Sequence, residues 1–400
     1  MTKVNWFLLL FIFPPSFQGF SQHTFIGSNR ELFVDDFLID RLDGASLKMH
    51  VPKDEGVAFY LDKPWEGKFS TYTTIIHDQG VFRAYYRGLP DVVEGNNQRL
   101  TCYAESKDGI DWYKPNLGIH EIKGSKDNNV ILVDEELTPN FTPFLDTNPN
   151  AKAEEKFKAL AGKQATGLFA LSSADGIHWV KIQDKPVLQE GNLDSQNVSF
   201  WSTTENKYLV FFRSTDSGFR SVSRSTSTDF KSWDKGIAMT FGSAPLEHIY
   251  TQQTSHYFRA PQIYLAVGAR FMPDKQVVTD GQATEMGIDP NYYKACSDAF
   301  LMTSRGGNQY RRYFMESYIR PGIGLNNWVS RTNYPALNVV QTSPYEMSGF
   351  SKEECQPIIG NELSRPVYWN NSTNVSRLSG TAVRMKIYLK DAAIYSFRFY

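Results

Sequence analysis

The stretch Ser106-Lys-Asp-Gly-Ile-Asp-Trp112 decides the expected fold, because similar stretches recur along the chain. Copies begin at Ser173 and Ser227 and a degenerate copy begins at Ser304, so about 50 to 80 residues separate them. The shared form S-x-D-[GF]-x-x-W suits a tight hairpin, in which Ser and Asp side chains bind backbone N–H groups and Gly takes a positive φ. The Trp would pack between sheets. This repetition predicts the blades of a β-propeller.

Strand-like segments fill the intervals between the copies. Residues 71–77 and 81–87 flank the turn Asp78-Gln-Gly80, and aromatic or alternating runs follow at 157–161, 167–172, 208–213 and 262–267. Four units and a fifth at 311–347, closed by the early strand 31–36, predict an all-β, five-bladed propeller over residues 30–347. Residues 348–400 predict a short β-sandwich-like appendage with strands at 382–389 and 393–399. That segment is too short for a complete two-sheet sandwich.

The composition limits the classes of partner. The 21 Tyr, 28 Phe and 8 Trp residues, with many Gly and Pro, are typical of an all-β domain rich in turns. A net charge of −1 argues against nucleic acid or an anionic membrane as partner, because both need a basic excess. The three cysteines provide neither a disulfide framework nor the spacing of metal ligands.

The N-terminal residues have the pattern of a targeting segment. Lys3 precedes an apolar run that ends at Phe13, and small or polar residues follow up to Ser21. We therefore predict a signal peptide over residues 1–21 and a secreted, periplasmic or cell-surface protein. The apolar run is too short to span a membrane, and no later run is long enough. A retained N-terminal anchor is the alternative.

Acidic residues that precede the first strand of each blade are the candidates for catalysis, because those strands surround the propeller axis. Glycoside hydrolysis needs two carboxyl groups about 5 to 9.5 Å apart, one of them protonated. The catalytic candidates are Asp35, Asp36, Glu66, Asp194 and Glu247. In the alternative interpretation, Asp35 or Asp36 caps a turn.

A second set of polar residues is expected to bind substrate. It comprises Arg213, Arg259, Asp146, His248 and Gln196. The arginines could pair with a catalytic acid or with an acidic sugar, or could stack on aromatic side chains at the surface. Asp146 begins a stretch that would also form an Asx turn without any functional role.

Other chemistries lack their signatures. The histidines show no H-E-x-x-H or similar metal spacing, and no G-x-S-x-G elbow, Walker motif or dinucleotide glycine motif is present. We therefore expect neither a metal nor an organic cofactor.

Several phrases resemble a known group of proteins. They are Leu32-Phe-Val-Asp-Asp36, Pro64-Trp-Glu-Gly67, Asn140-Phe-Thr-Pro-Phe-Leu-Asp146, Asp194-Ser-Gln-Asn197, Pro245-Leu-Glu-His248, and Asn326-Asn-Trp328 through Arg331-Thr-Asn-Tyr-Pro335. They are similar to phrases of exported bacterial proteins related to glycoside hydrolase family 32. That family belongs with families 43 and 68 to a set of five-bladed propellers that includes invertases, arabinanases and levansucrases. The chain lacks the family 32 phrases N-D-P-N-G, R-D-P and E-C-P.

The resemblance implies three acids. Asp194 corresponds by position to a mid-chain stabiliser of the transition state and Glu247 to the general acid, while the first acid could be Asp35, Asp36 or Glu66. The sequence thus predicts an exported glycoside hydrolase that acts on an oligo- or polysaccharide. The alternative is a non-catalytic carbohydrate-binding propeller.

Overall fold

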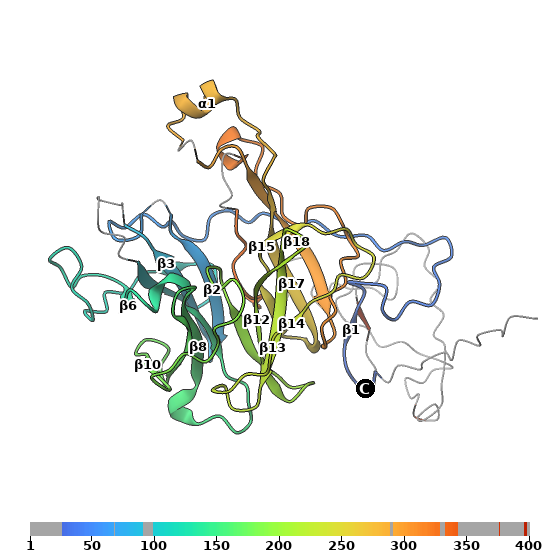
Figure 1. The fold of residues 1–400 in the computed structure, drawn as a ribbon, viewed down its shortest axis with the longest axis horizontal. Helices are drawn as coiled ribbons and strands as arrows, with labels where there is room; N and C mark the ends of the chain where they lie inside the picture. The colour runs from blue at the N-terminus through green and yellow to red at the C-terminus, as the bar shows by residue number, and fades with distance from the viewer. Residues whose placement is uncertain are drawn as a thin grey trace, which may run out of the picture.

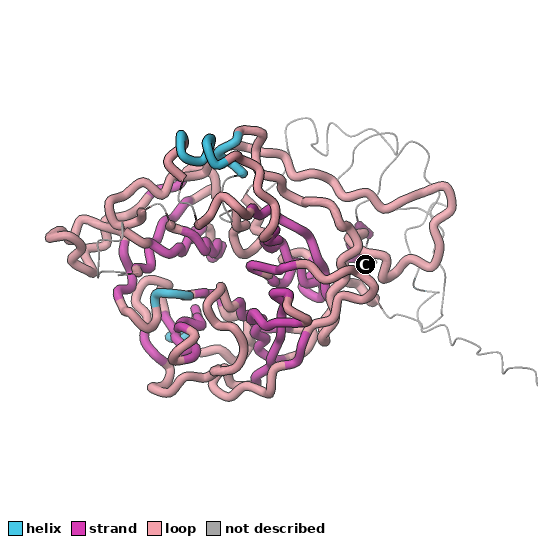
Figure 2. Tube along the Cα trace, turned by 45° about the horizontal axis from the view of Figure 1, so that its top comes forward, coloured by secondary structure: helices cyan, strands magenta, loops and turns pink. Residues whose placement is uncertain are grey.

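A computed structural model describes residues 26–67, 69–90, 99–288, 291–328, 333–342, 376 and 396–397 of this protein. Four β-sheets stand around a common centre, as Figures 1 and 2 show, and this mainly-β, propeller-like arrangement confirms the predicted class. The predicted signal peptide lies outside the described residues, and so does the predicted appendage apart from residues 376, 396 and 397. The fifth blade and the appendage stay predictions.

The first blade contains the predicted hairpin around Gly80. Its strands are β2 (Thr71–Asp78), β3 (Val81–Gly88), β4 (Leu100–Ser106), β5 (Trp112–Tyr113) and β6 (Val130–Val133). They are antiparallel in the order β2-β3-β4-β5, and β6 also pairs with β4. Alternate side chains of β2 are buried, as expected for a strand with two different faces.

The second and third blades are regular four-stranded antiparallel sheets. The second contains β7 (Thr142–Leu145), β8 (Phe157–Lys163), β9 (Gly167–Ser173) and β10 (Val180–Lys181), and the third contains β11 (Val198–Ser202), β12 (Lys207–Asp216), β13 (Phe219–Ser227) and β14 (Ile237–Ala238). The short 3-10 helices η1 (Thr138–Asn140) and η2 (Ala153–Glu155) flank β7. Every residue of β11 is buried.

The fourth blade has a broken inner edge. β15 (His248–Thr251) and β16 (Thr254–Tyr257) both pair with the long β17 (Ala260–Met272), which pairs on its other side with β18 (Cys296–Ser304). Gln252 and Gln253 form the break, where Gln253 has φ +49°. Residues 311 and 319 bridge to β18, so the start of the segment that was predicted as the fifth blade contacts the fourth blade.

Inner strands meet around the axis in the order β2, β7, β11 and β16. Residues 333–342 occupy the position beside β2, where Leu337 forms a parallel bridge with Thr74. Pro335 O also accepts a hydrogen bond from Gln253 of the fourth blade. This segment therefore lies between the first and fourth blades.

The polar, Gly-containing sequence of residues 273–293 predicts a long loop, but the interval contains the six-residue helix α1 (Asp280–Glu285). Thr279 caps this helix and Gln282 completes a capping box, a signal that the sequence carries at these positions. α1 projects from the top of the molecule in Figure 1, close to the 3-10 helix η3 (Leu325–Trp328). No helix in the described ranges is long and apolar enough to cross a membrane.

The strand predicted over residues 31–36 is shorter in the structure, where it is β1 (Glu31–Leu32). Among the described residues it pairs with β19 (Ser396–Phe397). Arg305, directly after β18, forms ion pairs with Glu31 and Asp35. The N-terminal segment is therefore fixed to the fourth blade by ion pairs.

The repeated turns have the predicted hydrogen bonds. In the second copy Ser173 Oγ accepts from Gly176 N and Asp175 Oδ1 accepts from the two following N–H groups, while Trp179 Nε1 donates 3.1 Å to Gly176 O. Gly176 has φ +80°, which favours glycine. In the third copy Phe230 takes this conformation with φ +64° and fills the core between the second and third blades.

Candidate functional site

Buried amide side chains cross the propeller axis. Gln196 Nε2 donates 3.0 Å to Thr74 Oγ1, and Gln253 Nε2 donates 2.8 Å to Gln196 Oε1. Gln196 precedes β11 and Gln253 lies in the break of the fourth blade, so the bonds link three blades. All three side chains are buried. The centre of the propeller is therefore closed by protein groups at this depth.

Three tyrosines form a stack just beyond this belt, where the inner strands begin. Tyr334 lies between the other two: its ring centroid is 4.9 Å from that of Tyr250 and 5.9 Å from that of Tyr72, and both pairs are stacked. The rings come from the first blade, the fourth blade and the segment 333–342. Burial raises the pKa of the Tyr72 phenol. Tyr72 has φ +60°, an unusual conformation for an aromatic residue.

Arginines surround the stack. The guanidinium of Arg87 lies 4.6 Å from the centroid of Tyr72, and those of Arg213 and Arg220 each lie 5.7 Å from the centroid of Tyr250. These distances are typical of cation–π contacts. Burial lowers the pKa of Arg87 and of Arg213, whereas the neighbouring tyrosines act in the opposite direction.

One carboxylate joins the arginines. Asp194 forms an ion pair with Arg213, and its side chain is 65% exposed whereas that of Arg213 is 9% exposed. The adjacent Ser195 donates a hydrogen bond of 3.0 Å to Tyr250 O. The loop before β11 thus brings a solvent-accessible carboxylate beside the tyrosines.

We call this group the tyrosine–arginine site. It consists of Tyr72, Tyr250, Tyr334, Arg87, Arg213, Arg220 and Asp194. His248 lies at its edge, where its Nδ1 accepts 3.2 Å from Arg220 N and its ring contacts Phe271. Burial and the nearby Arg220 lower the pKa of His248.

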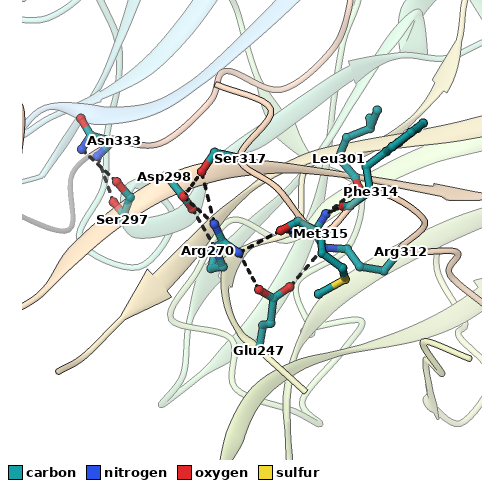
Figure 3. A network of polar contacts seen from close by, with 10 residues as sticks. All are labelled: Glu247, Arg270, Ser297, Asp298, Leu301, Arg312, Phe314, Met315, Ser317 and Asn333. Carbon is teal, nitrogen blue, oxygen red and sulfur yellow. Dashed lines mark hydrogen bonds and ion pairs between the residues drawn. The ribbon is translucent and has the colours of Figure 1, made fainter. Parts of the chain in front are cut away.

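Glu247 lies in an ion-pair network within the fourth blade. Arg270 donates 2.7 Å to its Oε1 and Arg312 donates 3.1 Å to its Oε2. Arg270 also binds Asp298, as Figure 3 shows, and the bonds to Asp298 and Glu247 raise the pKa of Arg270 although burial opposes them. Both carboxylate oxygens of Glu247 are therefore bound to arginines.

Glu66 is fully buried beside β3. Its carboxylate accepts 2.6 Å from Tyr86 OH and 2.8 Å from Lys114 Nζ, and Lys63 N donates to the same oxygen as Lys114. Gly67, at φ +72°, follows in the tight turn. These bonds fix the loop before β2 to the first blade.

Asp35 and Asp36 lie against the outer part of the fourth blade. Asp35 is buried and accepts 2.6 Å from Thr303 Oγ1, while Asp36 pairs with Arg311 at 2.9 Å. Asp35 also accepts from Phe37 N, which is the turn-capping arrangement considered from the sequence. Neither residue contacts the tyrosine–arginine site through a described interaction.

Asp146 and Arg259 lie toward the ends of the inner strands. Asp146 accepts from Lys158 at 2.5 Å and from Tyr208 at 2.8 Å. Burial lowers the pKa of Lys158, but its own contacts with Asp146 and Tyr208 outweigh burial and raise it. Arg259 is exposed and its guanidinium lies 5.5 Å from the ring of Phe258. Phe258 borders a cavity of about 490 Å³ that is also lined by His77 and His256.

The structure thus brings together Asp194, Arg213 and Gln196, with His248 at the edge, and places the other predicted residues elsewhere. The sequence analysis missed Tyr72, Arg87, Arg220 and Tyr334. A signal was available, because Tyr72 lies near the start of β2 and Tyr250 lies in β15, while Asp194 and Gln196 precede the inner strand β11. No group of three or more His, Cys, Asp or Glu side chains in the described ranges could hold a metal ion.

Comparison with known proteins gives distant matches of fold. No protein-family model matches the chain, and no curated protein matches its sequence. A solved "Glycoside hydrolase" aligns with a TM-score of 0.46 and 13% identity, over 70% of this chain and 82% of its own. An N-acetylgalactosamine deacetylase from F. plautii aligns with a TM-score of 0.44 and 13% identity, over 68% and 76%. A fructofuranosidase from Schwanniomyces occidentalis aligns with a TM-score of 0.37 and 11% identity, over 62% and 47%.

Proposed function

We propose that this protein is an exported glycoside hydrolase that binds an oligo- or polysaccharide at the tyrosine–arginine site. The observation that carries the proposal is the stack of Tyr72, Tyr334 and Tyr250 beside the exposed carboxylate of Asp194. Tyrosines that stack on one another present their ring edges and hydroxyl groups to a ligand, and a few charged groups beside them can orient it. A sugar ring has apolar C–H faces and hydroxyl edges that fit such a surface.

Asp194 is the catalytic carboxylate in this proposal. Its side chain is 65% exposed, so that it can reach a bound sugar, and Arg213 holds it in place. A carboxylate in this position can stabilise the positive charge that develops on the sugar in an oxocarbenium-like transition state. Gln196 and His248 support the site from below and from its edge.

The other predicted acids have structural roles in this proposal. Glu247 is bound through both oxygens to Arg270 and Arg312, and Glu66 has no exposed surface. Asp35 binds Thr303 and Arg305, and so it connects the N-terminal segment to the fourth blade. These three carboxylates are also far less exposed than that of Asp194, and so they are less accessible to a substrate.

A second candidate is a carbohydrate-binding propeller without catalysis. In the described part of the chain, Asp194 is the one carboxylate that pairs with an arginine of the site. Glycoside hydrolysis generally uses two carboxyl groups. A binding protein needs the tyrosine stack alone.

The test is hydrolysis of a panel of plant and algal oligosaccharides by the wild type and by Asp194→Asn, with Asp184→Asn as an exposed control. We expect release of sugar that falls about 100-fold or more in Asp194→Asn and is unchanged in Asp184→Asn. Glu247→Gln should retain the rate at temperatures where it stays folded. Release that survives Asp194→Asn would refute this catalytic assignment, and saturable binding without any release would establish the second candidate.

A further inference from the structure

The tyrosine–arginine site contains more guanidinium groups than carboxylates. Arg87, Arg213 and Arg220 approach the same stack, while among the described residues the ion-pair partner of Asp194 is Arg213. Asp274 acts on His248 electrostatically but forms no ion pair with these arginines among the described residues. The site as described therefore has more positive than negative charge.

Burial makes this excess unfavourable in the absence of a ligand. Burial lowers the pKa of both Arg87 and Arg213, and the like charge of Arg99 lowers that of Arg87 further. Arg87 Nε is buried and has no hydrogen-bond partner among the described residues. A buried cation without a full set of partners costs free energy that a bound anion would recover.

The direction of approach also fits an anion. The three arginines come from β3, β12 and β13, so that two blades hold them around rings supplied by β2, β15 and the segment 333–342. A guanidinium offers a planar set of N–H donors that match the oxygens of a carboxylate or a sulfate group. The ring edges and hydroxyl groups of the tyrosines beside these donors would contact the sugar ring that carries the anionic group.

We infer that the saccharide bound at this site is anionic, and that Arg87, Arg213 and Arg220 receive its carboxylate or sulfate oxygens while the tyrosines contact the sugar ring. The inference rests on the proposed function, because it specifies the ligand of the same site. According to this inference, the site selects its substrate by the charge of the sugar as well as by the shape of the sugar.

The test is calorimetric titration of the full chain with pairs of oligosaccharides that differ only in charge. One pair is an oligogalacturonide and its methyl ester, and the other is a sulfated galactan oligosaccharide and its desulfated form. We expect the charged member of one pair to bind at least about tenfold more tightly, and its affinity to fall as salt is raised. Whichever pair responds identifies carboxylate or sulfate as the group that is recognised.

Substitutions of the arginines test which residues cause the preference for a charged saccharide. Arg87→Met and Arg220→Met should bring the charged-to-neutral affinity ratio close to one, whereas the exposed Arg41→Met should keep the ratio. If Arg87→Met fails to fold, Arg220→Met provides the same test from the edge of the site. Equal affinities for both members of each pair would overturn the inference and leave the proposed function intact. Absence of binding to every charged and neutral saccharide would overturn both.

Discussion

Gln253 donates a hydrogen bond of 2.8 Å to Gln196 across the propeller axis, and both side chains are almost completely buried. The same Gln253 amide donates to Pro335 O, and the Gln196 amide donates to Thr74. Two glutamines thus join the first, third and fourth blades to the segment 333–342. Buried polar groups that hydrogen-bond to one another in this way favour a single arrangement of the surrounding elements.

Gln196→Ala should destabilise the protein by about 1–3 kcal/mol, because it leaves the amide of Gln253 with one partner fewer and opens a cavity. The measurement is urea denaturation followed by tryptophan fluorescence. The exposed Gln189→Ala is the matched control and should change the free energy of unfolding by less than about 0.5 kcal/mol. Equal stability of both variants would contradict a structural role for the amide belt.

The parts of the fold that local sequence determines could be predicted. The turn at Ser173, Asp175 and Gly176 forms through contacts between residues three or four positions apart, so the sequence alone contains them. The alternating sequence pattern likewise predicted β2 and β3, in which buried residues alternate with less buried ones over most of the length. Asp194 was identified because it precedes the aromatic strand β11, and Arg213 because it ends the aromatic run 208–213.

Long-range partners could not be predicted. Glu247 lies next to His248 in the sequence, but Arg270 and Arg312 lie 23 and 65 positions away, and nothing in the local pattern assigns them to Glu247. Tyr72, Tyr250 and Tyr334 meet only after the propeller has closed. A single sequence indicates where a residue lies along its strand, but it does not indicate which residues of other blades lie opposite it.

Glu247→Gln should lower the free energy of unfolding by about 1–3 kcal/mol, because it removes the negative charge between Arg270 and Arg312. Glu247→Gln, Arg270→Met and the double variant form a double-mutant cycle. We expect chemical denaturation to give a coupling energy above about 0.5 kcal/mol between the two residues. A coupling near zero would contradict the ion pair. An unchanged stability together with a loss of hydrolysis would instead indicate the catalytic role that the sequence suggested.

Stability should decrease in acid because of the repeated turns. Burial would raise the pKa of Asp175, but hydrogen bonds from the His178 side chain and from backbone N–H groups outweigh it and lower the pKa. The pKa of Asp108 in the first turn is also lowered, chiefly by backbone N–H groups. A depressed folded-state pKa contributes stability above the unfolded value of about 3.9, and this contribution is lost as the pH falls through the folded value.

The measurement is the midpoint of thermal unfolding of the wild type and of Asp175→Asn between about pH 7 and pH 2. At neutral pH the variant should be the less stable protein, and the difference should shrink as the pH falls below about 3.9. Asp184→Asn changes an exposed carboxylate and should leave the profile unaltered. A constant difference between wild type and Asp175→Asn at every pH would show that the charge of Asp175 does not stabilise the turn.

Gly268 in β17 lies against the break in the inner edge of the fourth blade. A Cβ atom there would meet Thr251 O at 2.3 Å and the Phe300 ring at 2.6 Å, so the backbone of β15 would have to move. Because Tyr250 immediately precedes Thr251, this movement would also shift the tyrosine stack. We expect Gly268→Ala to destabilise the protein by about 1–3 kcal/mol and to weaken saccharide binding.

The matched control for this substitution is Gly281→Ala in α1. The nearest heavy atom to a Cβ at that position is Thr279 Oγ1 at 4.0 Å, and Ala favours a helix over Gly by up to about 1 kcal/mol. Gly281→Ala should therefore keep or slightly raise the free energy of unfolding and leave binding unchanged. If Gly268→Ala binds saccharide as tightly as the wild type while it loses stability, the position of Tyr250 does not depend on the break and the stack tolerates movement of β15. If binding falls with stability in Gly268→Ala alone, the break in the fourth blade holds the site in its geometry.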